Sequence, residues 1–245
     1  MSPNADGGAA LVTGASRGIG QAIARKLAAD GLTIVNLDIA APEPGTPEAV
    51  HFTAVDLADR AATAAALAQI TAAHDITRLV NNAGIVQAAD LAGTTLEDLD
   101  RTVQVNLRAA LQCAQAVLPA MRRARFGRIV NIASRVVLGK TLRTAYAATK
   151  AGIAGFTRTW ALELGRDGIT VNTIGPGPIA TDMFTRGNPP DSPRTQAILD
   201  AIPVGRMGTP DDVAHAVAFF LDARSSFVTG QMLYVCGGLS AGKAD

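Results

Sequence analysis

Residues 13–20 read Thr-Gly-Ala-Ser-Arg-Gly-Ile-Gly and join two segments of opposite character. Residues 9–13 form a short apolar run, whereas apolar residues recur every three or four positions over residues 19–29. The first pattern is typical of a strand buried on both faces, and the second of an amphipathic helix. Glycines in such a strand-to-helix turn permit a tight bend and let backbone N–H groups approach a pyrophosphate at the helix N-terminus.

The same alternation continues along the whole chain. Strand, helix and strand in succession indicate parallel strands joined by right-handed crossovers. We therefore predict an α/β protein: a single doubly wound, parallel seven-stranded sheet (a Rossmann fold) with helices on both faces, and residues 1–245 forming one domain. The strands, each expected to be buried on both faces, are predicted at residues 9–13, 33–37, 51–55, 77–80, 128–132, 169–174 and 232–235. The helices are predicted at residues 19–29, 60–72, 107–122, 146–164 and 211–221.

Composition excludes several classes of protein. A length of 245 residues lies within what one hydrophobic core supports. The net charge of +1 and the mean hydropathy of +0.21 exclude a disordered chain and a general nucleic-acid surface. No apolar run approaches the ~20 residues of a membrane span, and the first residues lack the pattern of a signal peptide, so we expect a cytoplasmic protein. The two cysteines and three histidines lie far apart in the sequence, without the spacing of a disulfide framework or a metal site.

An acidic residue follows the glycine-rich turn at an informative distance. Asp38 ends the second predicted strand, 18 residues after Gly20. A carboxylate at that place can accept hydrogen bonds from the ribose hydroxyls of an adenosine and repels a 2′-phosphate. Arg17, inside the turn, could instead pair with that phosphate. We give Asp38 more weight, so the sequence favours NAD as cofactor over NADP. The alternative to dinucleotide binding is that residues 13–20 form an ordinary strand-to-helix turn.

Tyr146 and Lys150 are the candidate proton-transfer pair. They are four residues apart at the start of a predicted helix, so both side chains emerge on one face. A nearby ammonium favours the phenolate and is expected to lower the tyrosine pKa from about 10. Tyr146 could then act as a general acid or base near neutral pH. On the spacing alone, a tyrosine and a lysine on a partly exposed helix face is the favoured interpretation.

Several further motifs occur in a fixed order and together resemble the short-chain dehydrogenase/reductase family, in its compact form of roughly 250 residues. The resemblance extends over nearly the whole chain and is far more specific than any single motif. It is carried by the turn at residues 13–20, Asp56-Leu57, Asn81-Asn82-Ala83-Gly84, Asn106, Ser134, Tyr146 with Lys150, residues 176–181, Ser225, Thr229-Gly230 and Gly237-Gly238.

The resemblance implies a role for each matching residue. Tyr146 would exchange a proton with the substrate oxygen, Ser134 would orient the carbonyl, and Lys150 would assist the tyrosine and bind the nicotinamide ribose. Asn106 would complete the catalytic set by holding a water that links Lys150 to solvent. The implied cofactor contacts, including those of the turn, are Gly14, Ser16, Arg17, Gly18, Ile19, Gly20, Asp38, Asp56, Leu57, Asn82, Ala83, Gly84, Tyr146, Lys150, Pro176, Gly177, Ile179 and Thr181.

The function implied is hydride transfer between a nicotinamide dinucleotide and a secondary alcohol or ketone, with an acyl thioester among the candidate substrates. Within the family the chain is most similar to 3-oxoacyl-[acyl-carrier-protein] reductases, and an NADPH-dependent reductase of that kind is the alternative. Of the two arginines with which those enzymes dock their carrier, one matches Arg125 and the other falls on Asp167. This departure, with Asp38, favours an NAD-dependent alcohol dehydrogenase. A non-catalytic dinucleotide-sensing protein is disfavoured, because such proteins typically lack the tyrosine.

Two segments border the expected substrate position. Residues 181–203, which contain four prolines, are interpreted as a long loop that closes as a lid. Residues 135–145 carry Arg135, Lys140 and Arg143, which we interpret as solvated charges, with contact to an anionic substrate as the alternative. The run of Arg122, Arg123, Arg125 and Arg128 is interpreted as complementing a helix C-terminus. The resemblance also implies a homotetramer, with the helices at 107–122 and 146–164 at one subunit contact.

Overall fold

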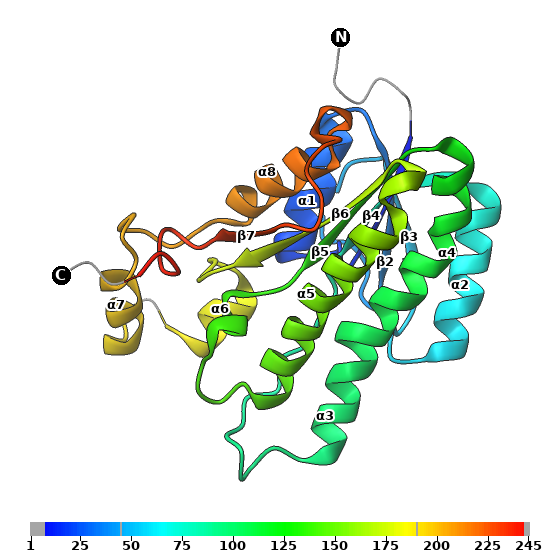
Figure 1. Ribbon diagram of the computed structural model, residues 1–245. Coiled ribbons are helices and arrows are strands. Elements are labelled where there is room, and N and C mark those ends of the chain that lie inside the picture. The colour runs from blue at the N-terminus through cyan, green and yellow to red at the C-terminus, as the bar shows by residue number, and fades with distance from the viewer. Residues whose placement is uncertain (1–7, 45, 190, 243–245) are drawn as a thin grey trace.

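The computed structural model describes residues 8–44, 46–189 and 191–242 and contains one parallel sheet (Figure 1). The predicted seven strands and Rossmann topology are confirmed, and no strand end differs from the prediction by more than two residues. The strands are β1 (Ala9–Thr13), β2 (Thr33–Asp38), β3 (Val50–Ala54), β4 (Ile76–Asn81), β5 (Gly127–Ile132), β6 (Ile169–Pro176) and β7 (Met232–Val235).

The order of the strands indicates where along the sheet a ligand would bind. The sheet runs β3-β2-β1-β4-β5-β6-β7, so the chain reverses direction across the sheet between β1 and β4. In doubly wound sheets, ligands bind in the crevice at the carboxyl ends of the strands beside such a reversal. Every residue of β1, β5 and β6 is buried. The edge strands β3 and β7 are partly exposed, which corrects the prediction of full burial, because an edge strand has a neighbour on one side only.

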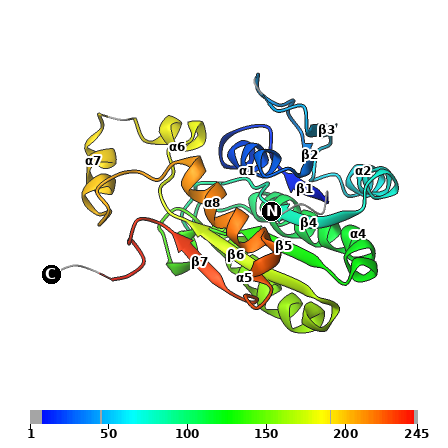
Figure 2. The same cartoon turned by 90° about the horizontal axis from the view of Figure 1, so that it is seen from above.

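Helices cover both faces of the sheet, as predicted (Figure 2). On one face α1 (Gly18–Ala29) and α8 (Pro210–Leu221) bury apolar side chains such as Ile23 and Val217 against the strands. On the other face α2 (Arg60–Ala73), α4 (Ala109–Ala124) and α5 (Thr144–Leu164) contribute Leu67, Val117 and Trp160 to a second core. None of the helices in the described ranges is long and apolar enough to cross a membrane.

Three helices were not predicted. Helix α3 (Leu96–Val103) carries apolar residues at helical spacing, Leu96, Leu99 and Val103, but it spans only eight residues and buries only Thr102, so the periodic segment was too short to be predicted. The lid segment, predicted as a loop, instead contains α6 (Asp182–Gly187) and α7 (Pro193–Asp200). Its prolines do not exclude a helix, because Pro193 lies in the first turn of α7, where its missing N–H is not needed. Ser192 caps that helix by accepting from the Thr195 N–H at 3.2 Å.

Two buried arginines anchor the end of α8 to the sheet. Arg78 and Arg128 are register partners on β4 and β5, and both are almost fully buried. Their Nε atoms donate to the carbonyls of Leu221 and Asp222, at 3.3 Å each. The Arg128 guanidinium also lies 4.3 Å from the centroid of the Phe126 ring. Arg128 therefore lies on a strand, as predicted for residues 128–132, and the interpretation that it complements a helix C-terminus is wrong.

Candidate active site

The glycine-rich turn has the geometry of an anion cradle. Gly14 lies in the left-handed region at φ 67°, and a Cβ on Gly20 would lie 2.0 Å from the Gly14 carbonyl oxygen. Only glycine therefore fits where α1 begins. That helix has no side-chain cap at Arg17 and no acidic residue in its first turn, so its positive end is left for a ligand.

Asn82 and Thr13 fasten this turn to the end of β4. The Asn82 Nδ2 donates to the carbonyls of Thr13 and Gly14, at 3.0 and 2.9 Å. The Thr13 hydroxyl accepts from the N–H groups of Asn82 and Ala83, both at 3.0 Å. The structure thus brings the turn beside the predicted residues Asn82, Ala83 and Gly84. The anchoring by Thr13 was not predicted, although this residue opens the quoted turn.

Asp38 reaches the same turn from the end of β2. Its Oδ2 accepts from the Ser16 N–H at 3.0 Å, and its Oδ1 accepts from the N–H groups of Ile39 at 2.7 Å and Ala40 at 3.3 Å. Within the described ranges no cation pairs with Asp38, and Arg17 is exposed without an ion pair. The negative charge therefore stands at the turn without a counter-ion.

The next predicted cofactor residues lie beyond β3. Leu57 is buried and lines a small cavity beside β4. The Asp56 carboxylate accepts from the Ala58 N–H at 2.8 Å and pairs with Arg101 of α3 at 3.2 Å. The unpredicted helix α3 thus supplies a partner that holds this acid in place.

The segment after β6 meets both the turn and the lid. Gly177 packs so closely on β7 that a Cβ there would lie 2.7 Å from the Cys236 Cα, and Ile179 is buried. The Thr181 hydroxyl caps α6 by accepting from the Phe184 N–H at 3.3 Å. A Cβ on Gly18 would lie 3.6 Å from the Thr181 methyl group, so the start of the lid contacts the glycine-rich turn. Pro176, the last residue of β6, leads into this segment.

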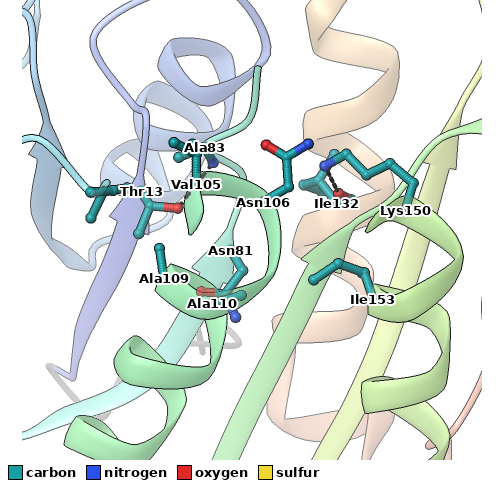
Figure 3. A pocket seen from close by; sticks show the side chains of 11 residues that line it. Thr13, Asn81, Ala83, Val105, Asn106, Ala109, Ala110, Ile132, Lys150 and Ile153 are labelled. Carbon is teal, nitrogen blue, oxygen red and sulfur yellow. Dashed lines mark hydrogen bonds between the residues drawn. The ribbon is translucent and has the colours of Figure 1, made fainter. Parts of the chain in front are cut away.

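The four predicted catalytic residues converge from β5, α5 and the helix before α4. Ser134 lies just after β5, near enough to the phenol of Tyr146 in the first turn of α5 to lower its pKa. One turn later, the Lys150 ammonium lies 5.7 Å from the centroid of the tyrosine ring. It donates to the carbonyl of Ile132 at 2.6 Å, an interaction drawn in Figure 3.

Asn106 lies in a π-helical segment, Gln104–Arg108, between α3 and α4. Such wide turns are rare and occur frequently at functional sites. The Asn106 amide accepts from the Ile85 N–H at 2.9 Å and donates to the Ile85 carbonyl at 3.1 Å. It also donates to the Thr149 hydroxyl at 3.1 Å, which joins it to α5 beside Lys150. Figure 3 shows the Asn106 amide and the Lys150 ammonium on the same side of the cavity.

The pKa values of the pair differ from the prediction. Burial raises the pKa of Tyr146, and the Ser134 hydrogen bond and the Arg143 charge oppose this rise. Burial also lowers the pKa of Lys150 to about 8. The expected lowering of the tyrosine pKa by Lys150 is therefore wrong for the structure without ligands. Desolvation of the phenol outweighs a lysine that donates to a carbonyl and is itself easily neutralised.

A buried polar chain lies beneath the catalytic residues and was not predicted. Asn81 donates to Asn131 at 2.9 Å, Asn131 donates to Thr157 at 2.8 Å, and the hydroxyls of Thr157 and Thr173 are hydrogen-bonded at 2.5 Å. The other amide atom of Asn81, its Oδ1, is buried without a hydrogen-bond partner among the described residues. Asn81 lines a cavity of about 10 Å³, room for a single water, together with Asn106 and Lys150. In the sequence, the adjacent Asn81 and Asn82 at the end of a buried strand could have indicated this polar chain.

Other candidate groups are structural. The described residues contain no cluster of metal-binding side chains. His51 and His74 are distant in sequence, but their rings stack 5.8 Å apart. Cys113 and Cys236 are buried free thiols, and Cys236 shares a hydrogen bond with Ser240 at 3.1 Å.

Comparison with known proteins identifies the family. The family model described as enoyl-(acyl carrier protein) reductase matches residues 14–240. The chain belongs to the short-chain dehydrogenase/reductase family. Among curated members, (2S)-[(R)-hydroxy(phenyl)methyl]succinyl-CoA dehydrogenase subunit BbsD of Thauera aromatica is 42% identical, covering 94% of this chain and 96% of that protein. The 3-oxoacyl-[acyl-carrier-protein] reductase FabG of Vibrio cholerae is 38% identical, covering 96% and 98%.

Solved short-chain dehydrogenase/reductase structures agree with this assignment. A gluconate 5-dehydrogenase of Burkholderia cenocepacia, in complex with NADP and tartrate, superposes with a TM-score of 0.88 at 33% identity over 97% of this chain and 96% of that one. A 3-oxoacyl (acyl-carrier-protein) reductase of Agrobacterium tumefaciens with NADP bound gives 0.85 at 31% identity over 94% and 93%. The protein is thus an NAD(P)-dependent oxidoreductase that interconverts hydroxyl and keto groups.

Proposed function

We propose that Tyr146 is the general acid and base for oxidation of a secondary alcohol, and for reduction of the ketone in reverse. The observation that carries this proposal is the convergence of Ser134, Tyr146 and Lys150 at the carboxyl end of β5. During reduction the phenol gives its proton to the oxygen that receives the developing charge, and Ser134 donates a hydrogen bond to the same oxygen. During oxidation Tyr146 takes the proton back.

Lys150 and Asn106 are positioned to move that proton onward. Because burial lowers the Lys150 pKa to about 8, the ammonium can release a proton near neutral pH. Asn106 lies at the same cavity, which has room for one water between these groups and the interior. This arrangement supports a relay from Tyr146 through Lys150.

The described residues fit a nicotinamide dinucleotide, which supplies the hydride when it is bound. The turn would hold the pyrophosphate through its N–H groups, because a Cβ on Gly20 would fill the cradle. Residues 82–84 would line the middle of the cofactor, and residues 176–181 would bind its carboxamide end. Asp56 and Leu57 would contact the adenine.

We further propose that NAD is preferred over NADP. The Asp38 carboxylate stands at the turn without a counter-ion, so a 2′-phosphate there would meet an uncompensated like charge. Arg17 is the one nearby cation that favours the phosphate, and the NADP bound to the two solved relatives supports the opposite choice. We weigh the fixed carboxylate above the exposed arginine.

The cofactor preference can be measured with a panel of ketones and 3-oxoacyl thioesters, which NADH or NADPH would reduce. The purified enzyme should turn over with NADH at least as well as with NADPH. Replacing Asp38 with Asn, which keeps the shape and removes the charge, should shift the ratio of kcat/KM toward NADPH by about tenfold. A wild-type enzyme at least ten times faster with NADPH would contradict the preference and favour the 3-oxoacyl reductase alternative.

The surface at the amino end of β6 argues against an acyl-carrier protein as partner. Arg125, which matches one docking arginine, pairs with Asp167 at 3.4 Å, and Arg122 pairs with the same carboxylate at 2.8 Å. Asp167 occupies the position of the second docking arginine. An acidic carrier would therefore meet a carboxylate in place of the second docking arginine, and two arginines that already share this carboxylate. We propose a small alcohol, ketone or acyl thioester as the substrate.

We propose that the enzyme is a cytoplasmic homotetramer. Exposed apolar side chains on the outer helix faces and on the edge strand would be covered by other subunits; they include Leu162, Phe219, Phe227 and Leu233. Light scattering should give a mass about four times the 25.1 kDa of one chain. A monomer at micromolar concentration would contradict the proposal. Free thiols at Cys113 and Cys236 suit a reducing compartment.

A further inference from the structure

Four basic side chains gather beside the catalytic tyrosine. Arg135, Lys140 and Arg143 lie on the segment between β5 and α5, and Arg194 lies in α7 of the lid. Within the described part of the chain, none of the four forms an ion pair with an acidic residue. Solvated charges on a protein surface are usually interspersed with the opposite sign, so a group of cations contributed by two separate segments is unusual.

These cations act on one another. Partial burial and the charges of Arg143, Arg135 and Arg194 lower the pKa of Lys140. The mutual repulsion holds excess positive charge at one place, and a bound anion would relieve it. The lid residue Arg194 belongs to this group, although it is 51 positions beyond Arg143 in the sequence.

The N-terminus of α5 adds to the same field. Arg143 is the N-cap residue and makes no side-chain capping bond, and the first turn contains no acidic residue. The positive end of this long helix therefore has neither of the usual compensations. In α3, by contrast, Thr95 caps the helix and two acidic residues lie in the first turn.

The backbone holds the cationic segment in a defined shape next to Tyr146. Leu142 has a φ of 59°, a conformation that costs energy for a branched side chain and that is concentrated at functional sites. The Arg143 guanidinium donates to the Leu142 carbonyl at 2.6 Å. Arg143 also lies near enough to Tyr146 for its charge to oppose the rise of the phenol pKa.

We propose that the substrate is an anion, whose carboxylate or phosphate oxygens bind among Arg135, Lys140, Arg143 and Arg194 while its hydroxyl or keto carbon faces Tyr146. This inference rests on the proposed function, because it places the reacting carbon at the tyrosine. The phosphates of the cofactor have their own cradle at the N-terminus of α1. Closing of α7 would bring Arg194 onto the bound anion, so the lid would select substrates by charge.

The test uses pairs of ketones that share the reacting group and differ in charge. Acetoacetate and methyl acetoacetate share the reacting group, as do acetoacetyl-CoA and acetoacetyl-N-acetylcysteamine. The initial rate of NADH or NADPH oxidation should give kcat/KM about tenfold higher for an anionic member than for its neutral partner, and this ratio should fall with added salt. Preference in the first pair indicates a carboxylate substrate, and preference in the second pair alone indicates the phosphates of a CoA thioester.

Two variants that remove a charge, one that keeps it and one control test whether the preference for anions depends on this cluster. Lys140→Gln and Arg194→Gln should each lower the anionic-to-neutral ratio about threefold or more, and Lys140→Arg should restore most of it. Arg166→Gln removes the same charge at the far end of α5 and should leave the ratio unchanged. If Lys140→Gln instead raised the KM for NADH alone, the cluster would serve the cofactor, and the proposal would be overturned.

Calorimetric titration separates this inference from the proposed function. Acetoacetate and CoA are titrated into the NAD(H)-saturated protein, with methyl acetoacetate as the neutral comparison. Binding of an anion that Arg194→Gln weakens, without turnover of any ketone, would support the anion site and contradict the proposed reaction. Equal kcat/KM within both pairs would overturn the anion site and leave the proposed reaction standing, as would turnover without selective binding of either anion.

Discussion

Replacement of Tyr146 by Phe is expected to lower kcat/KM for ketone reduction by about 10²–10⁴-fold. Tyr146 is half-buried beside Ser134 and Lys150, so the phenylalanine ring fills the same space but has no proton to give. Cofactor affinity should change little, because the turn at residues 13–20 is untouched. Initial rates and a fluorescence titration with NADH measure the two effects separately.

The second tyrosine of the chain is a matched control for this experiment. Tyr234 lies on the edge strand β7, where its ring packs against Gly175. The same Tyr→Phe change at position 234 should leave kcat/KM within about twofold of the wild type. A Tyr146→Phe enzyme that binds NADH normally and keeps full turnover would refute the role of the phenol as the proton donor.

Replacement of Lys150 by Met is expected to stabilise the fold while lowering kcat/KM about 100-fold. The Lys150 ammonium is buried, and its pKa falls from 10.5 to about 8, so the folded state disfavours the charged form. Between pH 8 and 10.5 the unfolded chain binds more protons, so the wild-type free energy of unfolding should rise with pH over this window. Below pH 8 the folded state carries the full free-energy cost of burying the charged ammonium. Methionine avoids it and should raise the free energy of unfolding at pH 7 by about 1–3 kcal/mol.

Urea unfolding at pH 7 and at pH 10 measures this effect. The advantage of the Lys150→Met variant should shrink at the higher pH, where the wild-type lysine is already neutral in the folded state. Lys26→Met is the control, because Lys26 lies in α1 in a partly exposed ion pair with Asp30. The Lys26→Met change should lower the free energy of unfolding by less than about 1 kcal/mol and should not raise it at pH 7. A Lys150→Met protein less stable than the wild type at pH 7 would contradict the argument.

The sequence predicted the sheet and the convergence of the main site residues because both depend on local patterns. An apolar run with no alternation signals a strand covered on both faces, and the carboxyl ends of parallel strands must share one edge. Asp38, Ser134 and the residues after Val80 each follow such a strand. Their common location is therefore a consequence of topology alone.

The remaining features depend on contacts between distant segments. The local pattern placed Arg128 on a buried strand, but it did not reveal that this guanidinium donates to the Asp222 carbonyl at the end of α8. The pairing of Asp56 with Arg101 depends on α3, a helix of eight residues whose apolar pattern is too short for a prediction. The Tyr146 pKa depends on how deeply the phenol is buried, which the spacing to Lys150 cannot reveal. The Ser192-Pro193 pair was a readable start signal for α7, but its prolines were interpreted as a loop.

The π-helical segment at Gln104–Arg108 makes the rod from α3 to α4 sensitive to its length. A π turn holds about one residue more than an α turn, and each residue of an α-helix advances the direction of the side chains by about 100°. Deleting one residue there would allow a regular helix, but it would rotate α3 by about a quarter of a circle relative to α4. The Asn106 amide would leave Ile85, and Arg101 would turn away from Asp56. The one extra residue in this segment therefore sets the rotation of α3, whose Arg101 pairs with Asp56, relative to α4.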